Sequence, residues 1–214
     1  CYFGGMLARA GAPVTLIGRR PHMDAVSRDG VFIDGLHVNE RVHVAAATEL
    51  EAVRDSQAVL FCVKTVDTET AAHALKPYLS PGCVVLSLQN GVDNVDRIDS
   101  ATKIDAIPTV VYVACEMIAP GHVKHSGRGD LVVGNLSWQT RNGIRRSMEL
   151  EAIAGMFERA GIHTARWVTC PDAAHLNEFV KANQSRLAKD VDGNYAYLAD
   201  TGVNDGFLAK LDEI

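Results

Sequence analysis

The sequence predicts an α/β protein with a mainly parallel sheet, followed by a partial, helical C-terminal segment. Two hydrophobic runs, Ala58–Lys64 and Cys83–Gly91, are the main indication. Strands that are buried on both faces of a parallel sheet form continuous runs of this kind instead of alternating patterns. The residues between the runs, 68–79, are typical of a helix. A strand, a helix and a strand in this order predict a parallel crossover unit.

The N-terminal residues predict a helix and then a strand. Apolar residues recur there at helical spacing, at Phe3, Met6, Leu7 and Ala10. Gly11 suits the left-handed position that ends a helix, and residues 13–18 have the composition of a strand. We interpret 1–18 as the helix and second strand of a Rossmann-like βαβ unit, without its first strand and glycine-rich phosphate turn. Gly4 and Gly5 do not replace that turn and are expected to allow close packing of the helix.

The rest of the chain alternates between expected strands and helices. In order, these are strands at 31–34 and 41–44, a helix near 49–54, the strand ending at Lys64, and helices at 68–79 and near 92–98. Strands follow at 109–115, 122–124 and 130–133, and their Pro/Gly turns predict antiparallel pairing. Residues 146–160 predict a helix closed by Gly161. We therefore expect a Rossmann-like domain over 1–171 and a separate segment over 172–214.

Polar side chains stand at the ends of both hydrophobic runs. Ligands of open α/β sheets bind outside the carboxyl ends of the strands. Lys64 and Asn90 are therefore expected to point into one crevice. The alternative interpretation is that Lys64 is a solvated strand end and that Asn90 and Gly91 form only a tight turn.

Two arginines follow the second strand of the βαβ unit. Enzymes that prefer NAD usually have an acidic residue there, whereas an arginine accommodates the 2′-phosphate of NADP. Arg19 and Arg20 therefore favour NADP, because a guanidinium stays charged and offers several donors to a phosphate. As an isolated pair they would more often form a solvated loop.

Taken together, these segments resemble the ketopantoate reductases (2-dehydropantoate 2-reductases). The resemblance runs from Cys1 to about Thr169 and is carried by Tyr2–Gly5, Gly18–Arg20, Phe61–Lys64, Leu86–Val92 and Pro120–Gly129. It implies reduction of 2-dehydropantoate (ketopantoate) to (R)-pantoate by NADPH, in pantothenate and coenzyme A biosynthesis. It also implies that Arg19 contacts the 2′-phosphate, that Lys64 lies near the nicotinamide end of the cofactor, and that Asn90 lies beside the nicotinamide and the substrate.

The resemblance also implies that 172–214 is the start or remnant of a helical substrate domain, whose first long helix carries a lysine as the general acid in that family. The nearest match is Lys181, with Phe179 in place of a tryptophan and Ser185 in place of an asparagine. A lysine suits this role because the alkoxide that develops as hydride arrives needs a positive charge or a proton. In an alternative alignment, 175–177 is a remnant of a later family segment and Lys181 is a surface residue. Lys64 is the competing candidate.

Composition describes a soluble globular protein, with 47% hydrophobic and 22% charged residues and a formal net charge of −5. This balance argues against nucleic acid as the main partner. No run approaches the roughly 20 apolar residues of a membrane span, and no signal segment opens the chain. We expect a cytoplasmic protein that acts on a small-molecule 2-keto acid and does not bind a membrane. A homodimer is the assembly that we consider.

Neither the cysteines nor the histidines predict a metal site. The five cysteines, at positions 1, 62, 83, 115 and 170, form no CxxC pair and are expected to be reduced core residues. His122 and His125 have no accompanying carboxylate or thiol motif. The turn-rich segments 190–194 and 201–206 suggest a calcium loop only superficially, because the first lacks the spaced carboxylates and terminal glutamate of an EF-hand.

Three functions from different classes remain open. The first is an NADPH-dependent ketopantoate reductase. The second is a non-catalytic nucleotide-binding module that has lost its substrate domain. The third is a reductase of another branched 2-keto acid, because the fold and the cofactor site do not choose a substrate.

Overall fold

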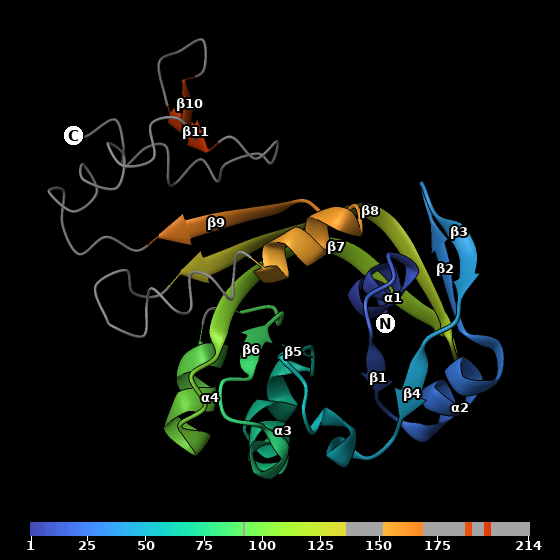
Figure 1. Cartoon of the computed structure of the whole chain (residues 1–214), viewed down its shortest axis with the longest axis horizontal. Coiled ribbons are helices and arrows are strands. Elements are labelled where there is room, and N and C mark those ends of the chain that lie inside the picture. The colour runs from blue at the N-terminus through green and yellow to red at the C-terminus, as the bar shows by residue number, and fades with distance from the viewer. Residues whose placement is uncertain (92, 136–151, 169–186, 190–194, 198–214) are drawn as a thin grey trace, which may run out of the picture.

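The computed structural model describes residues 1–91, 93–135, 152–168, 187–189 and 195–197. Its helices are α1 (Tyr2–Arg9), α2 (Arg20–Asp29), α3 (Thr68–Leu75) and α4 (Asn94–Thr102), with 3₁₀ helices η1 (Leu50–Val53), η2 (Thr65–Asp67) and η3 (Lys76–Tyr78). Its strands are β1 (Thr15–Ile17), β2 (Val31–Gly35), β3 (Asn39–Val42), β4 (Ala45–Ala47), β5 (Ala58–Phe61), β6 (Val84–Ser87), β7 (Ile107–Ala119), β8 (His122–Asn135), β9 (Thr164–Val168), β10 (Leu187–Lys189) and β11 (Tyr195–Tyr197). Residues 152–159 are also helical. The expected α/β class is confirmed (Figure 1).

A seven-stranded sheet has the order β3-β2-β8-β7-β6-β5, with β9 beside β8. Its β5–β6, β6–β7, β2–β8 and β8–β9 pairs are parallel, as a mainly parallel sheet requires. The β7–β8 pair is antiparallel, as the turns predicted. The two strands expected at 122–124 and 130–133 are parts of the single long strand β8. Figure 1 shows β7 and β8 as a long curved pair that runs from β6 at one end to β2 at the other.

The short strand β1 pairs with β4 in a separate parallel ladder, and β5 is the last strand of the large sheet. Side chains of β1 and β5 nevertheless pack against the same two hydrophobic clusters. Leu16 and Leu60 pack on one cluster, whereas Ile17 and Val59 pack on the other. Among the described strands none lies between β1 and β5. Within the described residues β1 and β5 are therefore joined by side-chain packing and not by backbone pairing.

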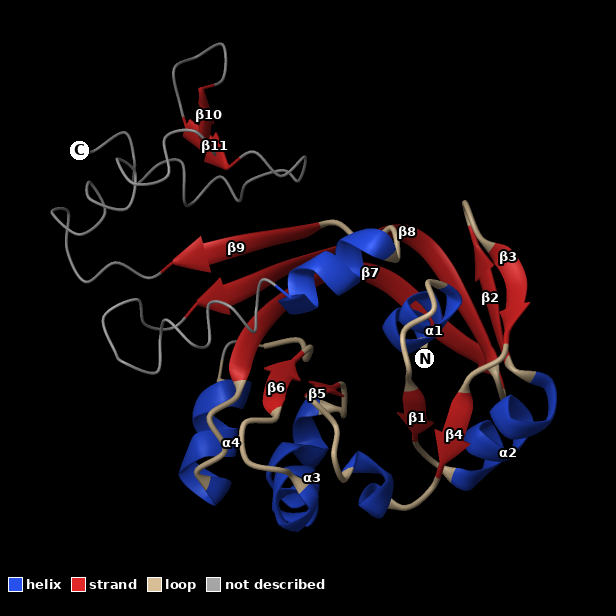
Figure 2. Ribbon diagram, in the orientation of Figure 1, coloured by secondary structure: helices blue, strands red, loops and turns tan. Residues whose placement is uncertain are grey.

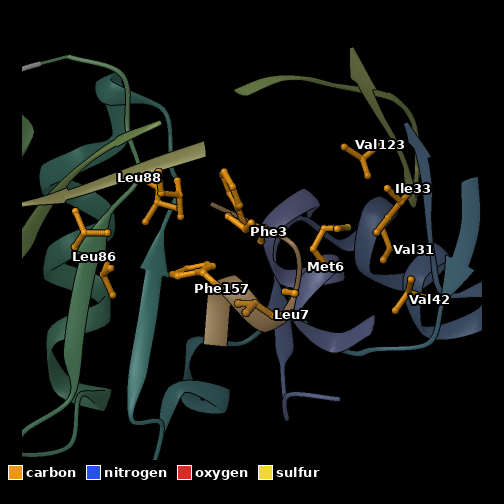
Figure 3. Close-up of a cluster of buried hydrophobic side chains, with 14 of the residues drawn as sticks. Phe3, Met6, Leu7, Val31, Ile33, Val42, Leu86, Leu88, Val123 and Phe157 are labelled. Carbon is orange, nitrogen blue, oxygen red and sulfur yellow. The ribbon is translucent and has the colours of Figure 1, made fainter. Parts of the chain in front are cut away.

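Two hydrophobic cores cover opposite faces of β5 and β6. The first, which we call the α1 core, includes Phe3 and Met6 of α1, Leu86 of β6 and Phe157. Figure 3 shows Phe157 near Leu86 and Leu88, while Met6 lies toward Val31 and Ile33. The second, the α3–α4 core, includes Phe61, Leu75, Val85 and Ile98. Figure 2 shows α3 and α4 on the same side of β5 and β6.

The two glycines of α1 allow it to lie close to its neighbours. A Cβ at Gly4 would overlap the side chain of Leu16, and a Cβ at Gly5 would lie 3.0 Å from Val31. The predicted packing role of this pair is confirmed. The helix ends as its sequence indicated, because Gly11 has a φ of 88°.

Three expected helices have different limits in the structure. The helix expected at 49–54 is the 3₁₀ helix η1, after which the chain turns at Asp55 with a φ of 64°. The helix expected at 68–79 ends at Leu75 and continues as η3, in which Pro77 has no N–H to donate to a preceding carbonyl. The helix expected near 92 begins at Asn94. None of the described helices has the length and apolar character that a membrane span requires.

Candidate functional site

Lys64 and Asn90 follow the carboxyl ends of two neighbouring parallel strands. Strand β5 pairs with β6 up to Phe61 opposite Ser87. Beyond this point the backbone N–H of Leu88 donates to the carbonyl of Phe61 at 3.0 Å. Both chain segments therefore leave the sheet at the same edge.

A direct hydrogen bond joins the two segments. The hydroxyl of Thr65 donates to the backbone carbonyl of Asn90 at 3.0 Å. Lys64 precedes η2 with extended backbone, at φ −66° and ψ 146°. Gly91 has a φ of 110°, so a tight turn also exists here, as one interpretation of the sequence expected. The structure thus brings the backbone segments of Lys64 and Asn90 together.

A buried polar network lies beneath these segments. The hydroxyl of Ser87 donates to Oε1 of Gln89 at 3.0 Å. Nε2 of Gln89 donates to the carbonyl of Val63 at 3.0 Å and to Oγ1 of Thr68 at 2.8 Å. The Gln89 amide therefore joins β6 to the residue before Lys64 and to the start of α3.

The network continues to the start of α4. The hydroxyl of Thr68 donates to Oδ1 of Asn94 at 3.1 Å. Nδ2 of Asn94 then donates to the carbonyl of Asn90 at 2.9 Å. Thr68 and Asn94 are the first residues of α3 and α4, so the same bonds hold both helices at the edge of the sheet.

The side chains of Lys64 and Asn90 are exposed. Neither makes a hydrogen bond or an ion pair with another residue of the described segments. An ammonium and a carboxamide that are free in this way can bind an anion and a carbonyl or amide group of a ligand.

Arg19 lies at a different place in the fold. It follows β1 and is the N-cap residue of α2, with φ −66° and ψ 140°. Its guanidinium is exposed and has no carboxylate partner in the part of the chain that the structure describes. No hydrogen bond or ion pair within these segments connects it to Lys64 or Asn90.

The predicted general acid, Lys181, lies outside the described residues, as do Phe179, Ser185 and the alternative segment 175–177. The turn-rich segments 190–194 and 201–206 also lie outside them. Within the described ranges, no three His, Cys, Asp or Glu side chains are grouped as a metal site would need.

Sequence reasoning missed the network residues Gln89, Thr68 and Asn94. The available signal was Gln89, a polar residue at the end of a continuous hydrophobic run, which must find hydrogen-bond partners if it is buried. The two partners that accept from its amide come from segments more than 20 residues away in the sequence, so spacing alone did not identify them.

A second feature that sequence reasoning missed lies where α1 begins. The ring of Tyr2 stacks on the imidazole of His125 in β8. Burial raises the pKa of Tyr2 to about 12, with smaller contributions from Cys115 and Asp130. Nε2 of His125 is buried without a hydrogen-bond partner among the described residues.

Comparisons with known proteins agree with this architecture. The family model described as ketopantoate reductase PanE/ApbA matches residues 1–138. A 2-dehydropantoate 2-reductase of Pyrococcus horikoshii is 34% identical over 163 residues, which are 75% of this chain and 50% of that protein. A 2-dehydropantoate 2-reductase of Halobacterium salinarum is 32% identical over 165 residues, which are 75% of this chain and 52% of that protein.

A solved structure is also similar. The crystal structure of a PanE/ApbA family ketopantoate reductase from Ralstonia eutropha JMP134 has a TM-score of 0.69 and 42% identity, covering 78% of this chain and 52% of that one. The chain spans about half the length of the curated relatives that it matches. The resemblance seen in the sequence is confirmed: the chain belongs to the ketopantoate reductase family of oxidoreductases.

Proposed function

We propose that this chain is the NADPH-binding part of a reductase that converts 2-dehydropantoate to (R)-pantoate. The observation that carries the proposal is the pairing of the segments of Lys64 and Asn90 at the carboxyl ends of β5 and β6, in a chain of this family. Parallel α/β sheets bind their ligands at this edge. The curated relatives bear the name of the same reaction.

The residues present fit a phosphorylated dinucleotide. Three exposed side chains, those of Arg19, Lys64 and Asn90, have no competing partner among the described residues. Arg19 offers a fork of donors to a 2′-phosphate, which NADPH carries and NADH lacks. Lys64 supplies a positive charge near the phosphates and the keto acid, and Asn90 supplies an amide donor beside them.

When bound, NADPH would supply the hydride that is added to the keto carbon. The chain must then stabilise the oxygen, which gains negative charge as the carbon is reduced, and must deliver one proton to it. We assign the proton to the ammonium of Lys181, in the proposed substrate segment 172–214. Lys64 holds the anionic groups in place and is the second candidate for the proton. We place the reaction in the cytoplasm, in pantothenate and coenzyme A biosynthesis.

The test combines binding and turnover on the purified chain. NADPH binding is measured by calorimetry, and turnover by the loss of NADPH absorbance with 2-dehydropantoate and a panel of other branched 2-keto acids. We expect binding and the fastest turnover with 2-dehydropantoate. Binding without turnover of any keto acid would instead support a non-catalytic module, and faster turnover of another acid would replace the substrate. Loss of turnover in Lys181→Ala with unchanged NADPH binding supports the assigned proton donor.

A further inference from the structure

We propose that Gln89 is a positioning residue, and that with Thr68 and Asn94 it fixes the backbone of Lys64 relative to that of Asn90. The three residues do not carry the chemistry themselves, because all of them are buried. They determine where the two exposed side chains stand. This inference rests on the proposed function, since it says how that site keeps its geometry.

The hydrogen bonds of the network run in one direction. Both N–H groups of the Gln89 amide are used, one on the carbonyl of Val63 and one on Thr68, while its oxygen accepts from Ser87. The Thr68 hydroxyl accepts this bond and donates its single proton onward to Asn94. The Gln89 amide therefore has one orientation that satisfies all three of its hydrogen bonds. A flipped Gln89 amide would place its oxygen against the Val63 carbonyl.

Burial makes this orientation compulsory. Ser87, Thr68, Gln89 and Asn94 are all at most 7% exposed. Water cannot readily replace a lost partner at such positions, and an unsatisfied buried polar group costs free energy. A partly satisfied network is therefore disfavoured, and the four side chains keep one arrangement.

The two ends of the network are the backbone atoms that matter for the site. One end is the carbonyl of Val63, directly before Lys64. The other is the carbonyl of Asn90, which accepts from Asn94 and also from Thr65, the residue after Lys64. Lys64 is thus held between two anchored neighbours. Moving it away from Asn90 requires breaking at least one of these bonds.

This arrangement predicts a separation of kinetic effects. Binding of NADPH is shared among several contacts, including the remote Arg19, so a small shift at Lys64 and Asn90 weakens it little. Hydride transfer depends on alignment of the reacting groups, and a displacement of about 1 Å can cost roughly 100-fold in rate. Disrupting the network should therefore lower kcat much more than it raises the KM for NADPH.

The test uses the full chain with Gln89→Glu and, as its control, Gln57→Glu. The first substitution keeps the size of the side chain but removes both donors, so a carboxylate oxygen faces the Val63 carbonyl. Gln57 is an exposed glutamine directly before β5, so its substitution makes the same change of charge outside the network. We expect Gln89→Glu to lower kcat by roughly 10- to 100-fold and to leave the KM for NADPH within about threefold, while Gln57→Glu retains wild-type kcat.

The pH dependence distinguishes positioning from general damage. Protonation of the introduced carboxyl group restores one of the two donors, toward either Val63 or Thr68. The ratio of kcat between Gln89→Glu and Gln57→Glu should therefore rise as the pH falls. A flat ratio, or a KM that rises as much as kcat falls, would overturn the proposal.

A second pair of variants tests the proposal if Gln89→Glu does not fold. Thr68→Val removes the hydroxyl at nearly constant size, and Thr68→Ser keeps it. We expect kcat to fall in Thr68→Val and to recover in Thr68→Ser, and equal kcat in the two would overturn the proposal. Amide hydrogen exchange of residues 62–68 and 88–91 provides a readout that needs no turnover, and should be faster in Thr68→Val than in Thr68→Ser. If the wild-type chain has no reductase activity, the proposed function fails, while this exchange still decides whether the network holds the two segments.

Discussion

The ring of Tyr2 stacks on the imidazole of His125, with 4.3 Å between the ring centroids and 23° between the ring planes. Tyr2 is the first residue of α1, and His125 lies in β8. The stack therefore attaches the start of the helix to the long antiparallel pair. Gly129 leaves room for the Tyr2 side chain, because a Cβ at this position would lie 3.0 Å from the Tyr2 hydroxyl.

The raised pKa of Tyr2 predicts a loss of stability in alkali. Burial raises this pKa to about 12, whereas an unfolded tyrosine ionises near a pKa of about 10. The folded chain then holds the proton more tightly than the unfolded chain. The contribution is complete below about pH 10 and is lost as the pH rises toward about 12. We expect Tyr2→Phe to weaken this decline, measured as the free energy of unfolding in urea at several pH values. Tyr78→Phe, on η3, is the control and should retain the wild-type decline.

The ion pair of Glu69 with Arg97 predicts that the chain loses stability as the pH falls into the acid range. Arg97 Nε and Nη2 donate to the two carboxylate oxygens of Glu69 at 2.7 and 2.8 Å, joining α3 to α4. These hydrogen bonds lower the pKa of Glu69 below its ordinary value. The stabilisation is present above the pKa of an unfolded glutamate and is lost as the pH falls through the lower folded value. An NMR titration of the carboxyl carbon should show the low pKa in the wild type. Arg97→Gln should return it toward the ordinary value, and an unchanged pKa would refute the assigned cause.

The position of Arg19 predicts the choice of cofactor. Hydrogen bonds to charged groups contribute about 1.5–3 kcal/mol, which corresponds to roughly 10- to 100-fold in binding. We expect Arg19→Asp to reduce the preference for NADPH over NADH by about this factor, measured as the ratio of the two dissociation constants. Arg20→Asp changes the charge of the neighbouring residue and is the control, with a smaller expected effect. An unchanged ratio in Arg19→Asp would mean that the 2′-phosphate is bound elsewhere.

The end of α4 offers a stabilising substitution. Lys103 has a φ of 61°, in the left-handed region that favours glycine. It also makes an exposed ion pair with Asp99 at 3.4 Å, which contributes about 0.3–0.5 kcal/mol. Lys103→Gly and Lys103→Ala both lose this pair, but only the first removes the Cβ. We expect Lys103→Gly to be more stable than Lys103→Ala by about 1 kcal/mol in chemical denaturation. Equal stability of the two variants would contradict a strained backbone at this position.

The sequence allowed the fold to be predicted where local patterns coincide with the core. Continuous hydrophobic runs identified β5 and β6, and helical spacing together with Gly11 identified α1 and its end. The predicted ends of helices were less accurate where a single residue determines the end. The helix expected at 68–79 ends at Leu75. Pro77 indicated an earlier end, but the expected limit followed the apolar residues as far as Leu79.

The candidate site was predictable only in part, for a physical reason. Lys64 and Asn90 could be singled out because each ends a recognisable strand. Gln89, Thr68 and Asn94 could not be grouped, because their hydrogen bonds join segments that meet only after the sheet has formed. The separation of the β1–β4 ladder from β5 and the shared packing of Leu16 and Leu60 required the three-dimensional structure.

That separation leaves side-chain packing as the connection between β1 and β5 within the described residues. The ladders of β1–β4 and β5–β6 have no backbone hydrogen bond in common among the described strands. Local unfolding proceeds in cooperative units that often follow such supersecondary pieces. The unit that precedes Arg19 and the unit that carries Lys64 and Asn90 are coupled through the two hydrophobic clusters that they share. A ligand that contacts Arg19 and Lys64 together would tie the two units, so that they exchange their amide protons as one.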